Sequence, residues 1–517
     1  MNKKYLYIAV IGVLIVGSIA TFSWPGSSSK QQTSPLKETP IVELKNGDSY
    51  DLLAGFVEKE INGVKYKMLA YNGSIPGPLI KIPQGAVGTI NFKNDTDMST
   101  LLHSHGVRMN NAFDGSQTAQ KEMKPGETFA YKLRFPDAGM YWYHPHVRED
   151  YEQELGLYGN YLVVPSDPNY WDTVNREIPL FLDDILIENG KITLNKQGAD
   201  HTLMGRYGNV MLVNGEANYS LSVKNGEVDR FYITNSANVR PFNFAIAGAK
   251  LKLVGADGGA YERDTWQDAV AIGPSERAIV EVLFDKSGTF NIENRTPDKT
   301  YTLGTINVSN DSVNVSYSKE FSILKTHVPT VQAIDPLRSY FDKAPDKQIK
   351  LALDMSGAPA QMQMSGGHMM GNGQVMGGSM MDLSPDGIEW DDTNKMMGSM
   401  SNIENVKWKI VDQVTGKENK NIDWTFKKDV PVKISIFNDP NSMHPMQHPI
   451  HFHGQQFLVL AKNGVKETNL VWKDTVMVPS GQTVDILLYP TNPGTWMAHC
   501  HIAEHLEAGM MFMYKVE

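Results

Sequence analysis

Cysteine is almost absent from this sequence: Cys500 is the only one in 517 residues. A single cysteine excludes an internal disulfide, so this residue is either an inert member of a core or a reactive or metal-ligating thiolate. Its immediate neighbours are His499 and His501. Two imidazoles beside the one thiol favour the ligating alternative.

Basic residues and helical patterns are also scarce. Lys and Arg number 48 against 58 Asp and Glu, and the net charge of −10, without a local basic stripe, argues against a nucleic-acid partner. Short apolar runs rich in Val, Ile, Tyr and Phe recur between turn clusters, as in residues 231–259, and favour an all-β fold. Because single cores stop growing at about 250–300 residues, a length of 517 predicts several domains.

Near the N-terminus, Lys3 and Lys4 precede an uncharged apolar run over residues 5–22. The run is long for a signal-peptide core and slightly short of the roughly 20 residues that span a bilayer, so a cleaved signal peptide and a membrane anchor both stay open. We interpret residues 1–42 as this segment plus a linker. We therefore expect an exported protein that is extracellular, at the cell surface or periplasmic, with membrane anchorage through residues 5–22 as one alternative.

Ten of the 14 histidines fall in four short clusters. Three clusters contain the pattern H-x-H, and the fourth is H-C-H, the same spacing around Cys500. The clusters are His103 and His105; His144 and His146; His448, His451 and His453; and His499, His501 and His505. Side chains on a strand alternate between faces, so histidines at i and i+2 share a face. One such pair is compatible with ordinary strand residues, whereas four pairs predict a multinuclear metal site.

The same alternation separates Cys500 from the histidines beside it. His499 and His501 face one side and Cys500 the other, so the thiolate can bind one metal while its neighbours bind a separate cluster. Two histidines, a thiolate and a weak axial methionine are the ligands of a blue-copper electron-transfer site. Here they would be His448, His505, Cys500 and Met510. Zinc would leave the flanking histidines unused, so the pattern indicates copper, with electrons passing along residues 499–501.

In this order, the four segments resemble the copper-binding motifs of the multicopper oxidases, the family that includes laccases and bacterial cuprous oxidases. The motifs read H-x-H-G at 103–106, H-x-H at 144–146, H-P-x-H-x-H-G at 448–454 and H-C-H-x3-H-x4-M at 499–510. The resemblance implies three consecutive cupredoxin-like Greek-key domains. It also implies four copper ions, one of type 1, one of type 2 and a type 3 pair, which couple four one-electron substrate oxidations to the reduction of O2 to water.

Transferred residue by residue, the resemblance fills every ligand position. The type 1 ligands would be His448, Cys500 and His505, with Met510 axial, and the type 2 ligands His103 and His451. The type 3 ligands would be His105, His144, His146, His453, His499 and His501. Asp114 and Glu504 match carboxylates that relay protons near the cluster in bacterial members, although Asp114 would also suit a turn before Gly115.

Composition places domain boundaries near residues 163–169 and 324–336. They predict a first domain over 43–165, a second over 170–322 and a third over 346–517. The second segment contains no H-x-H pair and no cysteine. We expect it to bind none of the four coppers and to position the outer two domains.

A methionine-rich insert over residues 355–400 carries eleven of the 26 methionines. Its many glycines and lack of other apolar residues count against a packed helix, and a low-complexity linker is the other alternative. Thioethers are soft, neutral ligands that favour Cu(I). The insert also resembles the one that lies over the type 1 site in bacterial cuprous oxidases.

A second methionine cluster lies just before His448. Met446 corresponds to a methionine that binds substrate Cu(I) in the cuprous oxidases, but the position of its acidic partner is occupied by His444. Met443 or Asp439 could compensate for this departure. The residues predicted to bind substrate Cu(I) are Met446, Met443, His444 and Met355.

The sequence thus predicts an exported multicopper oxidase that oxidises Cu(I) to Cu(II) in copper tolerance, with O2 as the acceptor. A laccase acting on phenols and a ferroxidase are the enzymatic alternatives, although Fe(III) prefers oxygen ligands and thioethers dominate here. Length and the histidines flanking Cys500 exclude a two-domain copper nitrite reductase. The non-enzymatic alternative is a copper-sequestering protein, which would not need the link through Cys500. We expect a monomer.

Overall fold

A computed structural model describes residues 33–194, 198–356, 368–369, 375–376, 385–392, 395–441 and 444–517. The predicted signal or anchor at residues 5–22, Met443 and most of the methionine-rich insert lie outside the described residues. Residues 33–517 group into one compact unit. No helix in the described part of the chain is long and apolar enough to cross a membrane.

The first domain consists of two five-stranded sheets within residues 34–164. Its strands are β1 (Ser34–Pro35), β2 (Ile41–Glu43), β3 (Ser49–Ile61), β4 (Val64–Tyr71), β5 (Leu79–Pro83), β6 (Val87–Asn94), β7 (Leu102–His105), β8 (Thr128–Arg134), β9 (Gly139–Pro145) and β10 (Gly159–Val164). One sheet has the order β1-β3-β6-β8 with β4 beside β3, and the other β2-β5-β10-β9-β7. β1 and most of β2 precede residue 43, the predicted domain start, because strands this short show no detectable hydrophobic period.

The second domain consists of a six-stranded and a five-stranded sheet within residues 176–312. Its strands are β11 (Arg176–Ile185), β12 (Ile187–Glu188), β13 (Lys191–Ile192), β14 (Val210–Val213), β15 (Tyr219–Asn225), β16 (Glu227–Asn235), β17 (Phe242–Ile246), β18 (Leu251–Ala256), β19 (Gly259–Gln267), β20 (Val270–Ile272), β21 (Arg277–Phe284), β22 (Gly288–Arg295) and β23 (Thr300–Ser312). The orders are β14-β11-β16-β21-β18-β19 and β15-β23-β22-β17-β20, and β12 and β13 form a separate hairpin.

The third domain, within residues 347–516, repeats this arrangement. Its strands are β24 (Lys347–Asp354), β25 (His368–Met369), β26 (Val375–Met376), β27 (Lys407–Asp412), β28 (Asp423–Phe426), β29 (Val432–Asn438), β30 (His448–Phe452), β31 (Gln456–Lys462), β32 (Val465–Lys466), β33 (Thr475–Val478), β34 (Thr483–Tyr489), β35 (Gly494–Cys500) and β36 (Met511–Val516). The orders β27-β24-β29-β34-β31-β32 and β28-β36-β35-β30-β33 correspond strand for strand to those of the second domain. The prediction of an all-β fold with three consecutive cupredoxin-like domains is therefore confirmed.

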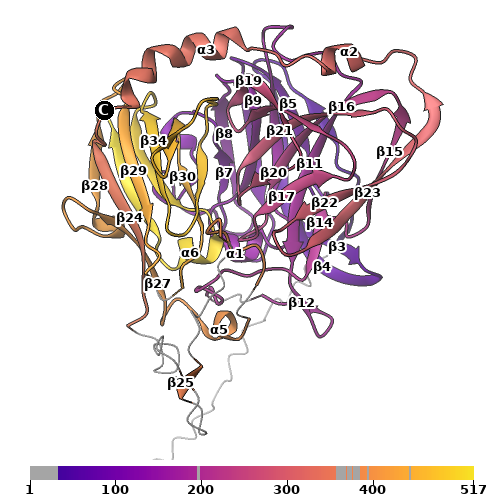
Figure 1. Cartoon of the computed structure of the whole chain (residues 1–517). Coiled ribbons are helices and arrows are strands. Elements are labelled where there is room, and N and C mark those ends of the chain that lie inside the picture. Colours follow the sequence, from indigo (N-terminus) through magenta and orange to yellow (C-terminus); the bar gives the residue numbers. More distant parts are fainter. Residues whose placement is uncertain are drawn as a thin grey trace, which may run out of the picture. The chain divides into compact units, whose positions relative to one another are not determined.

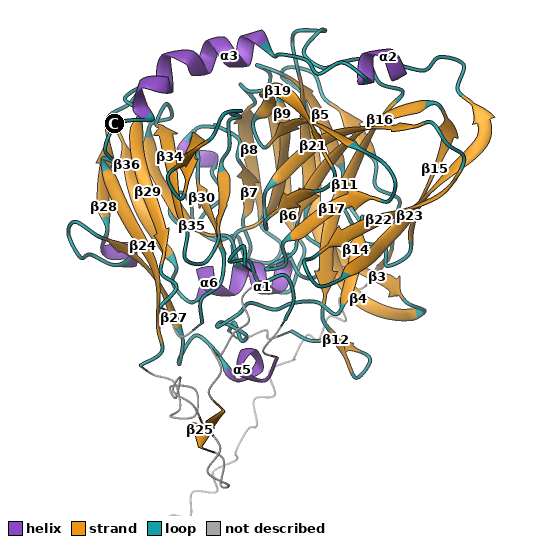
Figure 2. Ribbon diagram, in the orientation of Figure 1, coloured by secondary structure: helices purple, strands orange, loops and turns teal. Residues whose placement is uncertain are grey.

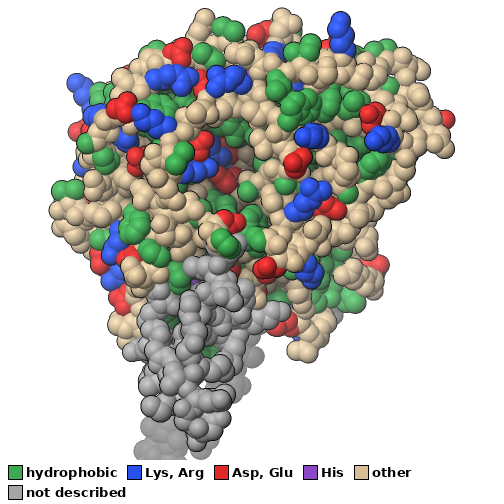
Figure 3. Space-filling view, in the orientation of Figure 1, with side chains coloured by type: hydrophobic (Ala, Val, Ile, Leu, Met, Phe, Trp, Pro, Cys, Tyr) green, Lys and Arg blue, Asp and Glu red, His purple; other side chains and the backbone are tan. Residues whose placement is uncertain are grey.

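Helices are few and short (Figure 2). They are the 3-10 helices η1 (Asn111–Phe113), η2 (Asp335–Tyr340) and η3 (Asn419–Asn421), and the α-helices α1 (Glu149–Glu152), α2 (Ser318–Phe321), α3 (Val328–Ile334), α5 (Lys395–Met400) and α6 (Ala503–Glu507). α1 and α6 follow two of the histidine clusters and contact each other (Figure 1). Lys and Arg side chains are interspersed with Asp and Glu on the face shown in Figure 3.

The first and third domains share one core. Buried residues from both, among them Trp142, Trp408 and Trp496, belong to a single hydrophobic cluster. The second domain has its own cluster, which includes Phe231 and Val280. Side chains at the ends of strands in the first and third domains are therefore packed against each other, which is where the predicted metal ligands lie.

Candidate metal centre

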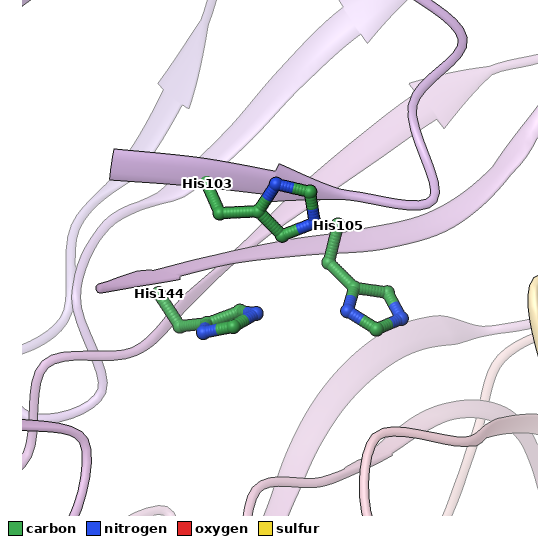
Figure 4. A group of neighbouring side chains, drawn as sticks. All are labelled: His103, His105 and His144. Atoms are coloured by element: carbon green, nitrogen blue, oxygen red, sulfur yellow. The ribbon is translucent and has the colours of Figure 1, made fainter. Parts of the chain in front are cut away.

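The paired histidines lie on neighbouring strands, as their spacing predicted. In the first domain, β7 runs antiparallel to β9 and places His103 opposite His144. In the third, β30 runs antiparallel to β35 and places His451 opposite His499. Figure 4 shows the rings of His103, His105 and His144 facing a common space. Pairing of adjacent strands thus gathers the histidines of the four motifs into two groups of rings, one in the first domain and one in the third.

Eight imidazoles from the two domains meet at the interface. Their ligand atoms form groups of three within 4.8 Å of one another, namely His103, His105 and His144; His103, His451 and His453; and His146, His453 and His499. The His501 ring centroid lies 5.0 Å from those of His105 and His144. All eight rings are buried. The structure therefore brings together every residue predicted to bind the type 2 and type 3 coppers, and their individual assignments stay predictions.

Five of these rings donate Nδ1–H to an oxygen beside the cluster. The pairs are His103 with the Asp114 carbonyl at 2.7 Å, His144 with the Pro145 carbonyl at 2.7 Å, His451 with the Asp474 carbonyl at 2.8 Å, His499 with the Cys500 carbonyl at 2.9 Å, and His453 with the Asp114 carboxylate at 3.0 Å. A proton on Nδ1 leaves the Nε2 lone pair for a metal. Among the residues that the structure describes, the Nε2 atoms of His103, His144 and His451 have no hydrogen-bond partner.

His105 has the opposite orientation. Its Nε2 lies 3.0 Å from both the Asp474 carboxylate and the Thr475 hydroxyl, and its Nδ1 has no hydrogen-bond partner in the described part of the chain. Asp474 is held in turn by two charge-assisted hydrogen bonds from Arg277, one of them 2.8 Å long. The carboxylate therefore fixes which nitrogen of His105 faces the cluster. Sequence reasoning missed Asp474, which carries no motif of its own.

The second site surrounds Cys500. Its Sγ lies 3.6 Å from Nδ1 of both His448 and His505, and these two nitrogens are 3.2 Å apart. The Trp408 ring packs on both imidazoles, with centroid distances of 4.7 and 4.4 Å. Met510 is fully buried, and its backbone hydrogen-bonds to Cys500 and to His505. The structure thus places all four predicted type 1 residues together.

The protonation states of both sites suit metal binding. Burial lowers the pKa of all ten histidines predicted to bind copper, and for most of these rings neighbouring histidines lower it further. The imidazoles are therefore neutral at neutral pH. Burial also raises the pKa of Cys500, so a stable thiolate there needs a bound cation. Buried nitrogens without partners are costly unless they bind something. The residues present therefore fit copper, which supplies one-electron redox chemistry when bound.

The two predicted proton-relay carboxylates differ in their surroundings. Asp114 is buried beside the cluster, 3.0 Å from His453 Nδ1, and accepts a 2.5 Å hydrogen bond from Ser116. Glu504 is also buried, and burial raises its pKa to about 7, but its described ion-pair partner is Arg206 at 3.8 Å. The carboxylate that faces cluster histidines on that side is Glu149, which sequence reasoning missed. The relay roles stay predictions.

The structure places an acidic residue beside His444 that the sequence did not suggest as a substitute for the missing acidic partner of Met446. The Nε2 atom of His444 lies 3.3 Å from the Glu389 carboxylate, at the C-terminal end of the methionine-rich insert. Asp439 instead pairs with Lys350 at 3.2 Å. The other described members of the predicted substrate site, Met446 and Met355, are both buried. Only contacts between segments far apart in sequence could have identified Glu389.

Comparison with known proteins agrees with this architecture. Three family models described as multicopper oxidase match residues 57–168, 168–315 and 390–517. Multicopper oxidase mco of Staphylococcus aureus is 26% identical over 456 residues, 87% of this chain and 83% of that protein. Multicopper oxidase MmcO of Mycobacterium tuberculosis is 26% identical over 494 residues, with the same two shares.

Solved structures show the same likeness. A multicopper oxidase from Campylobacter jejuni, described as a metallo-oxidase, superposes with a TM-score of 0.68 at 26% identity, over 94% of this chain and 96% of that one. McoA of Aquifex aeolicus has a TM-score of 0.68 at 23% identity and shares the fold. The chain belongs to the multicopper oxidases, oxidoreductases that use one type 1, one type 2 and two type 3 copper ions to pass electrons from a donor substrate to O2.

Proposed function

We propose that this multicopper oxidase oxidises Cu(I) to Cu(II) and thereby contributes to copper tolerance. The observation that carries the proposal is the buried His444–Glu389 pair, 3.3 Å apart, together with the buried Met446, since His444 and Met446 both come just before the type 1 ligand His448 in the chain. Met446 and His444 precede His448 by two and four residues. An electron taken from an ion held there has two peptide links to cross before it reaches His448.

Contacts on both sides hold this group in place. The Met446 carbonyl accepts a 2.7 Å hydrogen bond from the Asn438 amide. The Glu389 N–H donates to the Gln447 side chain at 2.7 Å, and the same side chain donates back to the Glu389 carbonyl at 3.3 Å. These bonds fix the end of the insert against the residues that lead into β30. The carboxylate of Glu389 consequently stays next to His444.

The three side chains differ in the oxidation state they favour. A thioether prefers Cu(I), whereas imidazole and carboxylate also suit Cu(II). Four Cu(I) ions would each release one electron, while one O2 and four protons become two water molecules. The rings of His448 and His505 are at most 1% exposed, which favours a small ion over a phenol that must contact a ring edge. The predicted role of the insert in capturing Cu(I) forms part of the same proposal.

The cellular setting is also proposed. The apolar run over residues 5–22 supports export, with either a cleaved signal peptide or a membrane anchor. We propose a monomer, because both copper sites are built from residues of one chain.

The test is oxygen uptake by the copper-loaded protein with buffered Cu(I), and separately with a simple phenol or Fe(II), as sole electron donor. A reaction without enzyme corrects for Cu(I) autoxidation. We expect saturable uptake with Cu(I) and little with the phenol. Faster turnover of the phenol would make the protein a laccase, faster turnover of Fe(II) a ferroxidase, and copper binding without oxygen uptake a sequestering protein.

Substitution of Met446 by Leu tests the site itself. The two side chains have similar volumes, so folding should change little while the soft ligand is lost. We expect a higher KM for Cu(I) and unchanged oxidation of an outer-sphere electron donor. Met68, buried in β4, offers a matched control as Met68→Leu. Equal Cu(I) kinetics in both variants would place the substrate elsewhere.

A further inference from the structure

Two of the eight cluster histidines lack the oxygen acceptor that the other six possess. Nδ1 of His146 and both ring nitrogens of His501 have no hydrogen-bond partner among the described residues. The Nε2 atom of His146 lies 3.2 Å from Nε2 of His453 and so points into the cluster. Metal-ligating histidines almost always donate their second ring N–H to a carboxylate, carbonyl or water. An acceptor for these two rings is therefore expected.

Glu149 faces both of them. Its Oε1 lies 3.5 Å from Nδ1 of His146, and its Oε2 lies 3.9 Å from Nδ1 of His501. The side chain is 1% exposed, and neither oxygen has a hydrogen-bond partner within the described ranges. Two buried acceptors thus oppose two buried nitrogens at distances slightly beyond a hydrogen bond. A shift of under about 1 Å would close both contacts.

The backbone brings Glu149 to this position by a sharp turn after β9. Arg148 adopts a left-handed conformation, with φ of +48°, that side-chain-bearing residues rarely occupy. α1 begins at the next residue, so the Glu149 side chain folds back over His146, three positions earlier. The Arg148 guanidinium holds Asp150 with bonds of 2.7 and 2.8 Å, which stabilises the turn.

We propose that Glu149 is a positioning residue for the type 3 pair, accepting Nδ1–H from His146 with one carboxylate oxygen and from His501 with the other. Both Nε2 lone pairs are then directed at the cluster. Because His146 belongs to the first domain and His501 to the third, one carboxylate orients ligands on both sides of the interface. Asp114 and Asp474 serve other rings, and the described contacts of Glu504 include no cluster histidine.

The experiment compares the copper-loaded full chain with Glu149→Ala, Glu149→Gln and the control Glu152→Gln. Glu152 lies in the same helix and is equally buried, but its carboxylate accepts hydrogen bonds from Thr100 and Thr96. The measurements are copper per chain during titration with a chelator, the fraction of that copper detected by EPR, and the blue absorption. A coupled type 3 pair is EPR-silent, so it is counted separately from the other ions. None of these readouts depends on the donor substrate, so a failure here is distinct from a failure of Cu(I) oxidation.

For Glu149→Ala we expect release of type 3 copper at roughly 10–100-fold lower chelator concentration, or a rise in the EPR-detected fraction, with the blue absorption unchanged. Glu149→Gln should be intermediate, because its amide oxygen still accepts from one ring. Wild-type copper retention together with a wild-type EPR-detected fraction in both variants, or the same changes in Glu152→Gln, would overturn the proposal. So would a crystal structure of the copper-loaded protein in which the Glu149 carboxylate lies more than 3.5 Å from both Nδ1 atoms.

Discussion

Arg277 links all three domains through its side chain. It starts β21 of the second domain, donates to the Met140 carbonyl of the first at 3.0 Å, and pairs with Asp474 of the third. The side chains of Arg277 and Asp474 are at most 1% exposed. We predict that Arg277→Met destabilises the metal-free protein more than loss of a partly exposed pair of the same geometry.

The magnitude follows from burial. Removing one partner of a buried ion pair costs about 3–5 kcal/mol, because the other charge stays buried without compensation. Arg108 and Asp137 form a comparable two-bond pair, with both bonds 2.7 Å long, but each side chain is 24% exposed. Its charges remain partly in water, so its contribution should lie nearer to that of an exposed pair, about 0.2–1 kcal/mol, although Arg108 also donates to the Thr491 hydroxyl at 2.6 Å. Arg108→Met is therefore the matched control, and the difference between the variants should be about 2–4 kcal/mol.

The assay is urea unfolding of the metal-free protein, followed by tryptophan fluorescence and by circular dichroism. Metal-free protein is used because Asp474 also orients His105, so copper loss would otherwise add to the effect. A second variant, Arg277→Met with Asp474→Leu, should recover part of the loss, because it removes both buried charges. Equal destabilisation by Arg277→Met and Arg108→Met would refute the reasoning, and so would no recovery in the double variant.

Three further predictions concern other parts of the chain. Cys500→Ser should abolish the intense blue absorption and lower the copper content from four ions to three, measured by visible absorption and metal analysis; an unchanged blue colour would exclude Cys500 as a type 1 ligand. Gly115→Ala should destabilise the protein by several kcal/mol and Gly126→Ala by only about 1–2 kcal/mol. Both glycines have φ near +80°, but a Cβ at Gly115 would lie 1.9 Å from the Leu102 carbonyl oxygen, whereas nothing lies within 4 Å of a Cβ at Gly126. Equal melting temperatures of the two variants would contradict this prediction. Burial raises the pKa of Asp183 to about 8, above the value of about 4 in the unfolded chain. Between these pH values the folded state holds one more proton than the unfolded state, so the wild-type protein should lose stability as pH rises from about 4 to about 8. In Asp183→Asn the slope of stability against pH should be smaller, and parallel stability–pH curves of the two proteins would contradict the assignment.

The ligand set could be predicted from the sequence because its signal is local. Strand alternation puts histidines at i and i+2 on one face, whatever the rest of the chain does. The positions of Cys500 and Met510 relative to His505 are likewise set by a few residues of strand, turn and helix. Four such segments together indicated copper, and the structure brings all twelve predicted ligands into two sites.

The residues that orient these ligands could not be predicted in the same way. Asp474 reaches His105 across 369 positions of sequence, and Glu389 reaches His444 only because the insert returns to the start of β30. Glu149 is close to His146 in sequence, but its second contact, with His501, depends on the packing of two domains. No sequence periodicity or motif around a carboxylate indicates which distant nitrogen it will face.

The sequence by itself determined the strand alternation, the four histidine clusters and the single thiol, because each depends on neighbours within a few residues. Only the tertiary structure decided which ring nitrogen faces each site, since that choice is made by the hydrogen-bond acceptor on the other nitrogen. Some acceptors are local, such as the Pro145 and Cys500 carbonyls that follow His144 and His499. The carboxylates of Asp474 and Asp114, by contrast, reach His105 and His453 only because the first and third domains pack into one core.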